Sequence, residues 1–395
     1  MSLLTAALLG VALQQWDAGD PSPDEQLVLE IINRARAAPT AEGTRLQSFS
    51  PIGLPGGDIK EGLDNPGSVG PRPPLAMNKN LLATSRAHSK DMYTRDYFDH
   101  DTKSPPTQTW VQRINAGGYS GALGENIATS SSGTAAFLED FLMVDWYFNA
   151  GVPTGVDHRG HRANLLDVDN AGSPYREVGV GYHLGAAPNG MGFKDFITQD
   201  FGRNGNGPFV LGVVYNDANG NGVYDIGEGM KGVTVRVSSA PGVFAVTTLS
   251  GGFAFPATTN SGAITIEFTG GQFGLTVVSK PVTPGFSGEN VKVDCKLADA
   301  SLPDTDNDHL PDGWEMAMFG NLTQTGGDDP DHDLATNLAE FNAGSDPTKP
   351  SSVPTGGGPG GGGSLTDSGG GGGGCGLCGL EVLLALSLWR FRRRS

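Results

Sequence analysis

Two histidines three positions apart are the first residues in this chain whose spacing could support chemistry. They are His158 and His161, in the stretch VDHRGHRANLL, where Gly160 precedes the second histidine and Leu165 and Leu166 follow it. Neutral imidazoles serve as metal ligands or as general bases, and they also occur as solvated loop residues. The sequence around the pair does not decide between these uses, so partner residues must be sought elsewhere in the chain.

Oxygen ligands at the spacing of a calcium loop form a second chemical pattern. An EF-hand-type loop supplies oxygens from positions 1, 3, 5, 7, 9 and 12 of about 12 residues, with Gly at position 6 for the sharp turn. The stretch NDANGNGVYDIGE has Gly222 at that turn position. Its predicted ligands are Asp217, Asn219, Asn221, Val223, Asp225 and Glu228. A solvated Asn/Gly turn is the alternative interpretation.

The same offsets recur twice in a later acidic segment. In DTDNDHLPDGWE the predicted calcium ligands are Asp304, Asp306, Asp308, Asp312 and Glu315. In DPDHDLATNLAE they are Asp329, Asp331, Asp333, Asn337 and Glu340. The turn position is His309 in the first of these loops and Leu334 in the second. A positive φ strains any residue other than Gly, and Leu tolerates it worse than most, so we expect the Asp329 loop to bind calcium more weakly.

Composition excludes several classes of protein. The chain has 395 residues and a formal net charge of −17, which disfavours nucleic-acid binding because that binding depends on Lys and Arg neutralising phosphates. The three cysteines, Cys295, Cys375 and Cys378, are too few for a disulfide framework. Cys375 and Cys378 form a lone CxxC, which we interpret as a small-residue boundary in place of half a zinc site.

Both ends of the chain carry export features. The apolar run from Leu3 to Leu13 is typical of a secretory signal core, although no basic residue precedes it. At the other end, a glycine tract leads into a short apolar stretch ending in Arg392, Arg393 and Arg394. That stretch is shorter than the about 20 apolar residues of a stable membrane span, and the arginines fit the positive-inside rule. The tail resembles bacterial C-terminal sorting tails of the GlyGly type. We therefore expect a secreted or surface-attached protein of the bacterial envelope, with membrane contact only through the tail before processing.

Pattern changes divide the chain into six segments: a signal-like segment (1–21), a mixed α/β domain (22–203), a β-rich domain (208–300), an acidic calcium-repeat segment (301–350), a Gly-rich linker (351–374) and the tail (375–395). In the mixed domain, apolar periodicity predicts helices from Pro23 to before Pro39, over 80–95 and over 134–148. Alternation in EVGVGYHL and FITQDFG predicts strands. Short runs such as VTVRV and AITIEF, separated by turn residues, predict a small β-sandwich.

An ordered series of motifs in the mixed domain resembles the bacterial branch of the CAP superfamily, which includes cysteine-rich secretory (SCP), antigen 5 and pathogenesis-related 1 proteins. The resemblance covers about residues 25–203, roughly half of the chain. Its motifs are AHSKDM (87–92), YFDH (97–100), AGGY (116–119), GENIA (124–128), VDWY (144–147), GHRANLL (160–166), EVGVGY (177–182) and TQDFG (198–202). The resemblance implies a three-layer α-β-α sandwich with a cleft lined by two His and two acidic residues.

Carried over motif by motif, the resemblance assigns His100, Glu125 and His161 to that cleft. Asn149 stands about where a second acidic residue is expected, so the set of four is incomplete. His158 has no counterpart in the motif and is interpreted as a loop residue or an auxiliary ligand. His88, on the predicted 80–95 helix, is interpreted as a structural histidine.

Two imidazoles and a carboxylate allow three uses. They can hold Zn²⁺ in an open site that activates water. Glu125 can instead poise one imidazole as a general base without metal. The third use is structural, with the three side chains holding the cleft together through hydrogen bonds. The resemblance implies no general enzymatic activity, since proposals for the family range from sterol or lipid binding to peptide hydrolysis.

The later segments resemble calcium-binding B-type repeats of bacterial adhesins and thrombospondin type-3-like calcium repeats. Together, these features predict a secreted or cell-surface protein that binds an extracellular ligand (a lipid, a peptide or a surface polymer) and carries a calcium-stiffened stalk. The alternative is a secreted metal-dependent hydrolase, peptidase-like, that uses His100, Glu125 and His161. Calcium is the expected cofactor, and zinc is a candidate second one.

Overall fold

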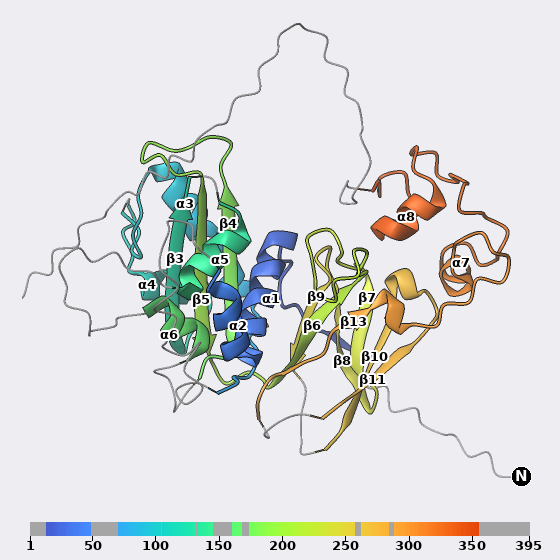
Figure 1. Cartoon of the computed structure of the whole chain (residues 1–395), viewed down its shortest axis with the longest axis horizontal. Coiled ribbons are helices and arrows are strands. Elements are labelled where there is room, and N and C mark those ends of the chain that lie inside the picture. The colour runs from blue at the N-terminus through green and yellow to red at the C-terminus, as the bar shows by residue number, and fades with distance from the viewer. Residues whose placement is uncertain are drawn as a thin grey trace, which may run out of the picture.

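The computed structural model describes residues 13–48, 70–103, 105–131, 133–144, 160–167, 174–256, 262–283 and 288–354. Several predicted features lie outside these residues: the start of the signal-like segment, His158, Asn149, most of the Gly-rich linker, and the sorting tail with Cys375 and Cys378. Figure 1 shows three folded parts along the chain. We call them the front unit (22–203), the all-β unit (209–296, with the strand Gln14–Gln15) and the paired-loop unit (304–346).

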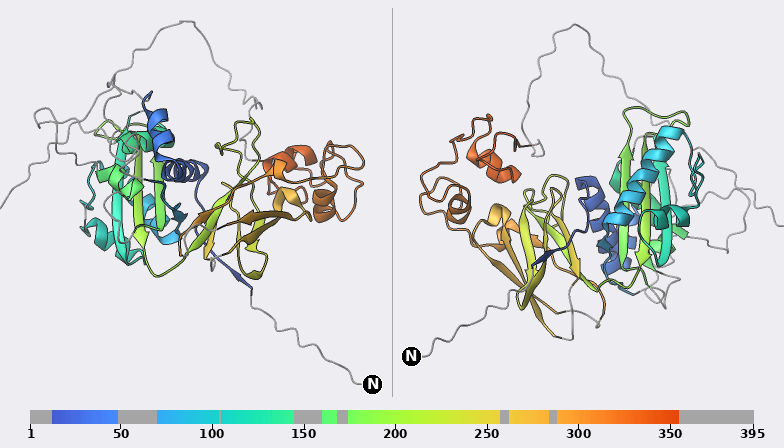
Figure 2. Two further views of the ribbon diagram at one scale, coloured as in Figure 1. Left: turned by 60° about the horizontal axis from the view of Figure 1, so that its bottom comes forward. Right: turned by 180° about the vertical axis from the view of Figure 1, so that it is seen from behind.

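The front unit is built on one sheet with helices on both faces (Figures 1 and 2). Its strand order is β2-β4-β5-β3, from Ala76–Met77, Glu177–Leu184, Asp195–Arg203 and Ala122–Ser130. The helices are α1 (Pro23–Ala37), α2 (Pro39–Leu46), α3 (Lys79–Arg95), α4 (Trp110–Ala116), α5 (Ala135–Val144) and α6 (Gly160–Leu166). The unit is therefore mixed α/β and layered, as the sequence predicts.

Helix α3 covers one face of the sheet at unusually close range. Asn78 caps its start by accepting from the backbone of Asn80 and Leu81. Opposite it, Gly179 and Gly181 of β4 have no room for a side chain: a Cβ on Gly179 would lie 2.0 Å from the Leu81 carbonyl carbon, and one on Gly181 2.1 Å from the Arg86 nitrogen. The two glycines of the EVGVGY motif thus allow helix and strand backbones to touch.

Helix α1 packs on the other face, together with α2, α5 and α6. Its first turn has a capping box in which Ser22 and Glu25 satisfy each other's backbone N–H groups. The main core of the unit lies between this face and the helices, and it includes Val28 and Ile32 of α1, Leu138 of α5 and Val178 of β4. Burial of this apolar surface is the main stabilising contribution to the unit.

Predicted and observed elements agree for the long periodic segments. The predicted helices ending before Pro39 and over 80–95 are α1 and α3, and α5 covers the part of the predicted 134–148 helix that the structure describes. The short helices α2, α4 and α6 were not predicted, because seven or eight residues carry too few turns for a clear 3.6-residue period.

The all-β unit consists of two sheets that share one core. One sheet has the order β1-β8-β7-β10-β11, and in the other β6 pairs with β9, β12 and β13. The strands are β1 (Gln14–Gln15), β6 (Phe209–Tyr215), β7 (Val233–Val237), β8 (Ala240–Val246), β9 (Gly252–Pro256), β10 (Ile264–Gly270), β11 (Val278–Val282), β12 (Val291–Lys292) and β13 (Cys295–Lys296). Buried side chains of both sheets, such as Val235, Phe255 and Phe268, form the common core.

Helix α1 also forms the joint between the front unit and the all-β unit (Figure 1). Leu27 of α1 packs against a cluster of Val213, Tyr215 and Tyr224 from the all-β unit. Next to it, Lys292 Nζ lies 2.8 Å from Glu30 Oε2. A cavity of about 270 Å³ lies at this joint, lined by residues of both units. The two units are therefore held by apolar and ionic contacts.

The paired-loop unit is compact. Each acidic loop leads into a short helix, α7 (Asp312–Met318) after the first and α8 (Asn337–Ala343) after the second. Trp314 of α7 and Phe341 of α8 meet edge to face, with ring centroids 5.4 Å apart, in a small core of their own. Near its start, α7 contacts η2 (Gly271–Phe273), a 3₁₀ turn that follows β10. Within the described part of the chain, no helix is long and apolar enough to cross a membrane.

Candidate functional sites

His100 and Glu125, two of the three cleft residues predicted from the sequence, are hydrogen-bonded to each other. His100 Nδ1 lies 2.8 Å from Glu125 Oε1. The second carboxylate oxygen, Oε2, accepts from the Arg113 guanidinium, which also donates to the His100 carbonyl at 2.8 Å. Arg113, in α4, was not predicted, because it lies twelve residues from Glu125 in a separate helix. Both oxygens of Glu125 are thus engaged, and the carboxylate orients His100.

Asp200 is a second buried carboxyl beside this pair, and it too was not predicted. It lies directly opposite Glu125 in the β3–β5 register. Its Oδ2 accepts from Thr84 Oγ1 at 2.6 Å, while its side chain is fully buried. Burial and the charge of Glu125 raise the pKa of Asp200 well above its usual range. Burial also raises the pKa of Glu125 to about 7, although Arg113 opposes this.

His88 has a structural environment in α3. Only 1 % of it is exposed, and its Nε2 lies 3.0 Å from the Asp99 carbonyl. Burial lowers the pKa of His88 to about 3, so the ring is neutral and Nε2–H is the donor. This agrees with the interpretation of His88 as a hydrogen-bonded structural histidine.

His161, the third predicted residue, lies in α6 at the edge strand β3. Its carbonyl accepts from Asn126 Nδ2 at 3.1 Å. Asn126 follows Glu125 in β3, so their side chains point to opposite faces of the sheet. Asn126 also donates to Gln199, and Asn164 donates to Asn126. These asparagines and the glutamine belong to the GENIA, GHRANLL and TQDFG motifs, so one hydrogen-bond network explains why the motifs contain them.

The predicted zinc set is only partly assembled. A metal centre needs ligand atoms of several His, Cys, Asp or Glu side chains close together. Among the residues that the structure describes, three groups of such side chains have ligand atoms within 4.8 Å of one another. None of the three groups contains His100, Glu125 or His161. Arg113 also donates to one carboxylate oxygen of Glu125. The described geometry therefore brings His100 and Glu125 together without completing a three-ligand centre, and zinc stays a prediction.

The first predicted calcium loop, 217–228, closes around Asp225. Asn219 Nδ2 and Asn221 Nδ2 both donate to Asp225 Oδ2, at 2.7 and 2.6 Å. Each amide would present its oxygen instead after rotating half a turn. Asp217 accepts from the Gly222 backbone and forms an ion pair with Lys296 Nζ at 2.9 Å. The side chains at positions 1, 3, 5 and 9 are therefore hydrogen-bonded within one small loop.

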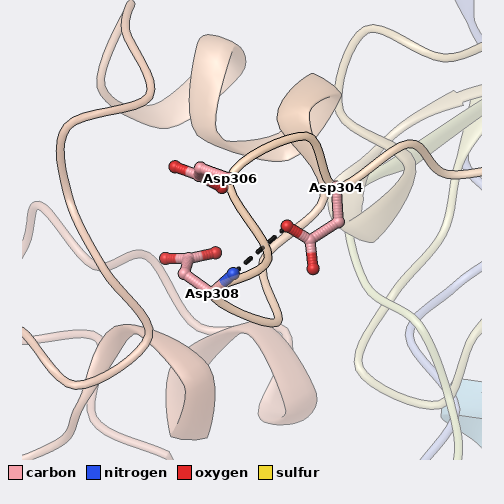
Figure 3. Close-up of side chains that lie close together, drawn as sticks. All are labelled: Asp304, Asp306 and Asp308. Atoms are coloured by element: carbon pink, nitrogen blue, oxygen red, sulfur yellow. Dashed lines mark hydrogen bonds between the residues drawn. The ribbon is translucent and has the colours of Figure 1, made fainter.

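The second predicted loop, 304–315, collects carboxylates in two overlapping groups. Figure 3 shows Asp304, Asp306 and Asp308 around the loop, with the Asp308 backbone donating to Asp304 Oδ1 at 3.2 Å. Oxygens of these three lie within 4.8 Å of one another, and so do oxygens of Asp306, Asp312 and Glu315. The five predicted ligands therefore lie in two groups that share Asp306.

Glu315 is the most unusual of these carboxylates. Its side chain has no exposed surface, and neither carboxylate oxygen accepts a hydrogen bond from any residue in the described ranges. Burial, followed by the charges of the nearby aspartates, raises the pKa of Glu315 to about 7. A buried carboxylate without donors is destabilising unless a proton or a cation neutralises it.

The third predicted loop, 329–340, repeats this arrangement. Asp329, Asp331 and Asp333 have oxygens within 4.8 Å of one another. Asn337 Oδ1 and Glu340 Oε2 are buried without a partner among the described residues. Glu340 Oε1 differs from its counterpart in the second loop because it accepts from Ser345 Oγ at 3.1 Å. Three of the five ligands predicted from spacing, the aspartates, therefore come together here, and Glu340 is not grouped with them.

No family model matches the chain, and no curated protein matches it. Among solved structures, it is similar to an extracellular protein containing an SCP domain from Bacillus anthracis strain Ames. The two are 26 % identical, the match covers 33 % of this chain and 34 % of the other, and the TM-score is 0.24. The matched part thus spans about a third of that protein's length.

Proposed function

We propose that this chain is an exported protein of the bacterial envelope, in which a CAP-like front unit binds an extracellular ligand and the regions behind it bind calcium. Export is supported by the signal-like start and the sorting-like tail. The CAP resemblance is supported by the motif series, whose polar members form the network around Asn126 in the front unit. The all-β unit, with its two sheets and shared core, suits the expected β-sandwich.

The observation that carries calcium binding is the carboxylate of Glu315. It is fully buried, and its oxygens have no donor among the described residues. One of its oxygens lies within 4.8 Å of oxygens of Asp306 and Asp312. Calcium prefers carboxylate oxygens and accepts a bidentate Glu at position 12 of such a loop. A divalent cation at this point would neutralise the carboxylates that otherwise repel one another.

Calorimetry on the full chain tests this proposal. Titration with CaCl₂ is expected to show binding heat that is reduced by Glu315→Gln and by Glu340→Gln. Glu267→Gln is a matched control, because it removes the same charge from a β10 carboxylate that pairs with Arg236 outside the loops. Absence of calcium heat in the unaltered chain would refute the calcium half of the proposal.

Binding is favoured over catalysis in the front unit by the state of Glu125. Its carboxylate is held by His100 on one oxygen and by Arg113 on the other, as in a structural or ligand-positioning network. The ligand class is an extracellular lipid, peptide or surface polymer. Thermal-shift screening of the full chain against these three classes would test this, and a shift lost on Glu125→Gln would place the ligand at this site.

A secreted hydrolase is the second candidate, and the 2.8 Å contact between His100 and Glu125 is the observation that favours it. A carboxylate that orients an imidazole makes it a better general base, and zinc held by His100, Glu125 and His161 would activate the attacking water. This candidate requires peptide turnover that Glu125→Gln abolishes, and stoichiometric zinc that His161→Ala removes. If the unaltered protein shows neither peptide turnover nor bound zinc, ligand binding remains the proposed function of the front unit.

A further inference from the structure

The first loop of the paired-loop unit is attached to the all-β unit by a close backbone contact. Leu275, just after the turn η2, donates its backbone N–H to the Gly313 carbonyl at 3.1 Å. Gly274 approaches the same group so closely that a Cβ on it would lie 2.1 Å from the Gly313 oxygen. Gly313 lies between Asp312 and Glu315, two predicted calcium ligands. The docking residue and the ligand residues are therefore neighbours in the first turn of α7.

A second contact joins the all-β unit to α8. Gln272 of η2 is 2 % exposed and donates to the Phe341 carbonyl, with the Asn342 carbonyl a further 3.4 Å acceptor. Phe341 follows the predicted ligand Glu340 directly. Each helix of the paired-loop unit thus contacts η2 or the segment just after it through a residue within two positions of a position-12 glutamate.

The cores of the two units also meet. Leu297, which directly follows β13, packs against both the core of the all-β unit and the core around Trp314 and Phe341. Trp314 is 1 % exposed and lies between Gly313 and Glu315 in the chain. Any change in the first turn of α7 would therefore move both the hydrogen-bonded and the apolar part of this contact.

Calcium would act on that turn. Oxygens of Asp306, Asp312 and Glu315 lie within 4.8 Å of one another, and Glu315 is buried with both oxygens lacking donors among the described residues. Like charges at this spacing repel one another unless a cation lies between them. A cation would hold the start of α7 against loop 304–315, and with it the Gly313 carbonyl and the Trp314 ring.

We propose that calcium in loop 304–315 fastens the paired-loop unit to the all-β unit, so that calcium binding and docking at η2 stabilise each other. This inference depends on the calcium binding proposed above. It changes the expected role of the segment, because calcium here fixes a joint between two packed units in place of stiffening an extended stalk. By linkage, the factor by which calcium strengthens docking equals the factor by which docking strengthens calcium binding.

Hydrogen exchange on the full chain, read by mass spectrometry over residues 271–278, tests whether calcium stabilises the docking at η2. With saturating CaCl₂, exchange of the Leu275 amide is expected to slow by about tenfold or more relative to EDTA. Glu315→Gln should abolish this slowing. Unchanged exchange at Leu275, in a protein that calorimetry shows to bind calcium, would overturn the inference and leave the proposed function intact. Absence of calcium heat would instead defeat the proposed function.

Gln272→Ala tests whether docking strengthens calcium binding, and it leaves every predicted calcium ligand unchanged. It removes the η2 contact to α8 while all loop carboxylates remain, and calcium affinity is expected to fall by about fivefold. Leu275→Ala is the control, because that side chain is 66 % exposed and the docking bond uses only its backbone N–H. Equal calcium affinity of Gln272→Ala and the unaltered chain would overturn the proposal, whether or not Glu315→Gln folds.

Discussion

Gly222 and Leu334 have the same backbone conformation at the same position of two loops. Their φ values are 83° and 80°. The Gly222 N–H donates to Asp217 Oδ2 and the Leu334 N–H donates to Asp329 Oδ2, and both distances are 3.1 Å. Glycine adopts this left-handed region without strain, but a residue with a branched side chain does not. The Leu334 side chain is 95 % exposed, so no burial offsets the cost.

Leu334→Gly is therefore expected to tighten calcium binding by the third loop. Relief of left-handed strain contributes about 1 kcal/mol, which corresponds to roughly fivefold in affinity. Calorimetry on the full chain measures it. Leu334→Ala removes the exposed side chain but keeps a Cβ at the same φ, so it should give a much smaller gain. Equal gains for Ala and Gly would show that strain is not the cause.

Gly179→Ala is expected to destabilise the front unit by about 3 kcal/mol, because overpacking here displaces backbone. The new Cβ would lie 2.0 Å from the Leu81 carbonyl carbon, which can move only if α3 moves. Gly160→Ala is the matched control, since nothing lies within 4 Å of its Cβ position and Ala favours helix. Urea-dependent pulse proteolysis, read on front-unit fragments, compares the two. Similar stabilities for both variants would contradict the close helix–strand contact.

Lys292→Met is expected to weaken the joint between the front unit and the all-β unit. Lys292 is the cation between Glu30 and Asp294, and the Glu30 side chain is only 13 % exposed. Removing the Lys292 charge leaves the two carboxylates facing each other, which lowers the free energy of unfolding by about 2 kcal/mol. Adding Glu30→Gln should recover part of that loss. A double-mutant cycle on the thermal midpoint measures the coupling, and additive effects would mean that the pair does not hold the joint.

The sequence predicted local features best. The helix start at Pro23, the apolar stripe of α3 and the ligand spacing of the acidic loops are all patterns within a few residues. The structure has helices α1 and α3 and groups of three carboxylates at these places. Even the strained turn position could be located in advance, since His309 and Leu334 replace the usual Gly and both have positive φ.

Long-range partners could not be predicted in this way. Arg113 reaches Glu125 only because α4 folds beside β3, and Asp200 faces Glu125 only through the β3–β5 register. Neither relationship has a sequence period. The acidic segment was predicted only as a series of calcium loops, because its apolar residues Trp314 and Phe341 come together only after two helices form.

Glu139 of α5 provides a pH dependence whose sign is fixed by burial. Its side chain is fully buried and accepts from Gln199, and burial raises its pKa from 4.5 to about 8. Below pH 4.5 the carboxyl is protonated in both the folded and the unfolded chain, so its full contribution to stability is present. Between pH 4.5 and 8 only the unfolded chain releases the proton, so the free energy of unfolding falls as pH rises.

Glu139→Gln should remove this dependence, because the amide is isosteric and does not titrate. The difference in unfolding free energy between the variant and the unaltered chain should grow in favour of the variant by up to about 1.4 kcal/mol per pH unit as pH rises toward 8. Pulse proteolysis of the front unit at pH 5.5, 7 and 8.5 measures it. Asp140→Asn is the control, since Asp140 pairs with Arg45 at a more exposed point of the same helix. A difference that stays constant with pH would show that Glu139 titrates normally in the fold.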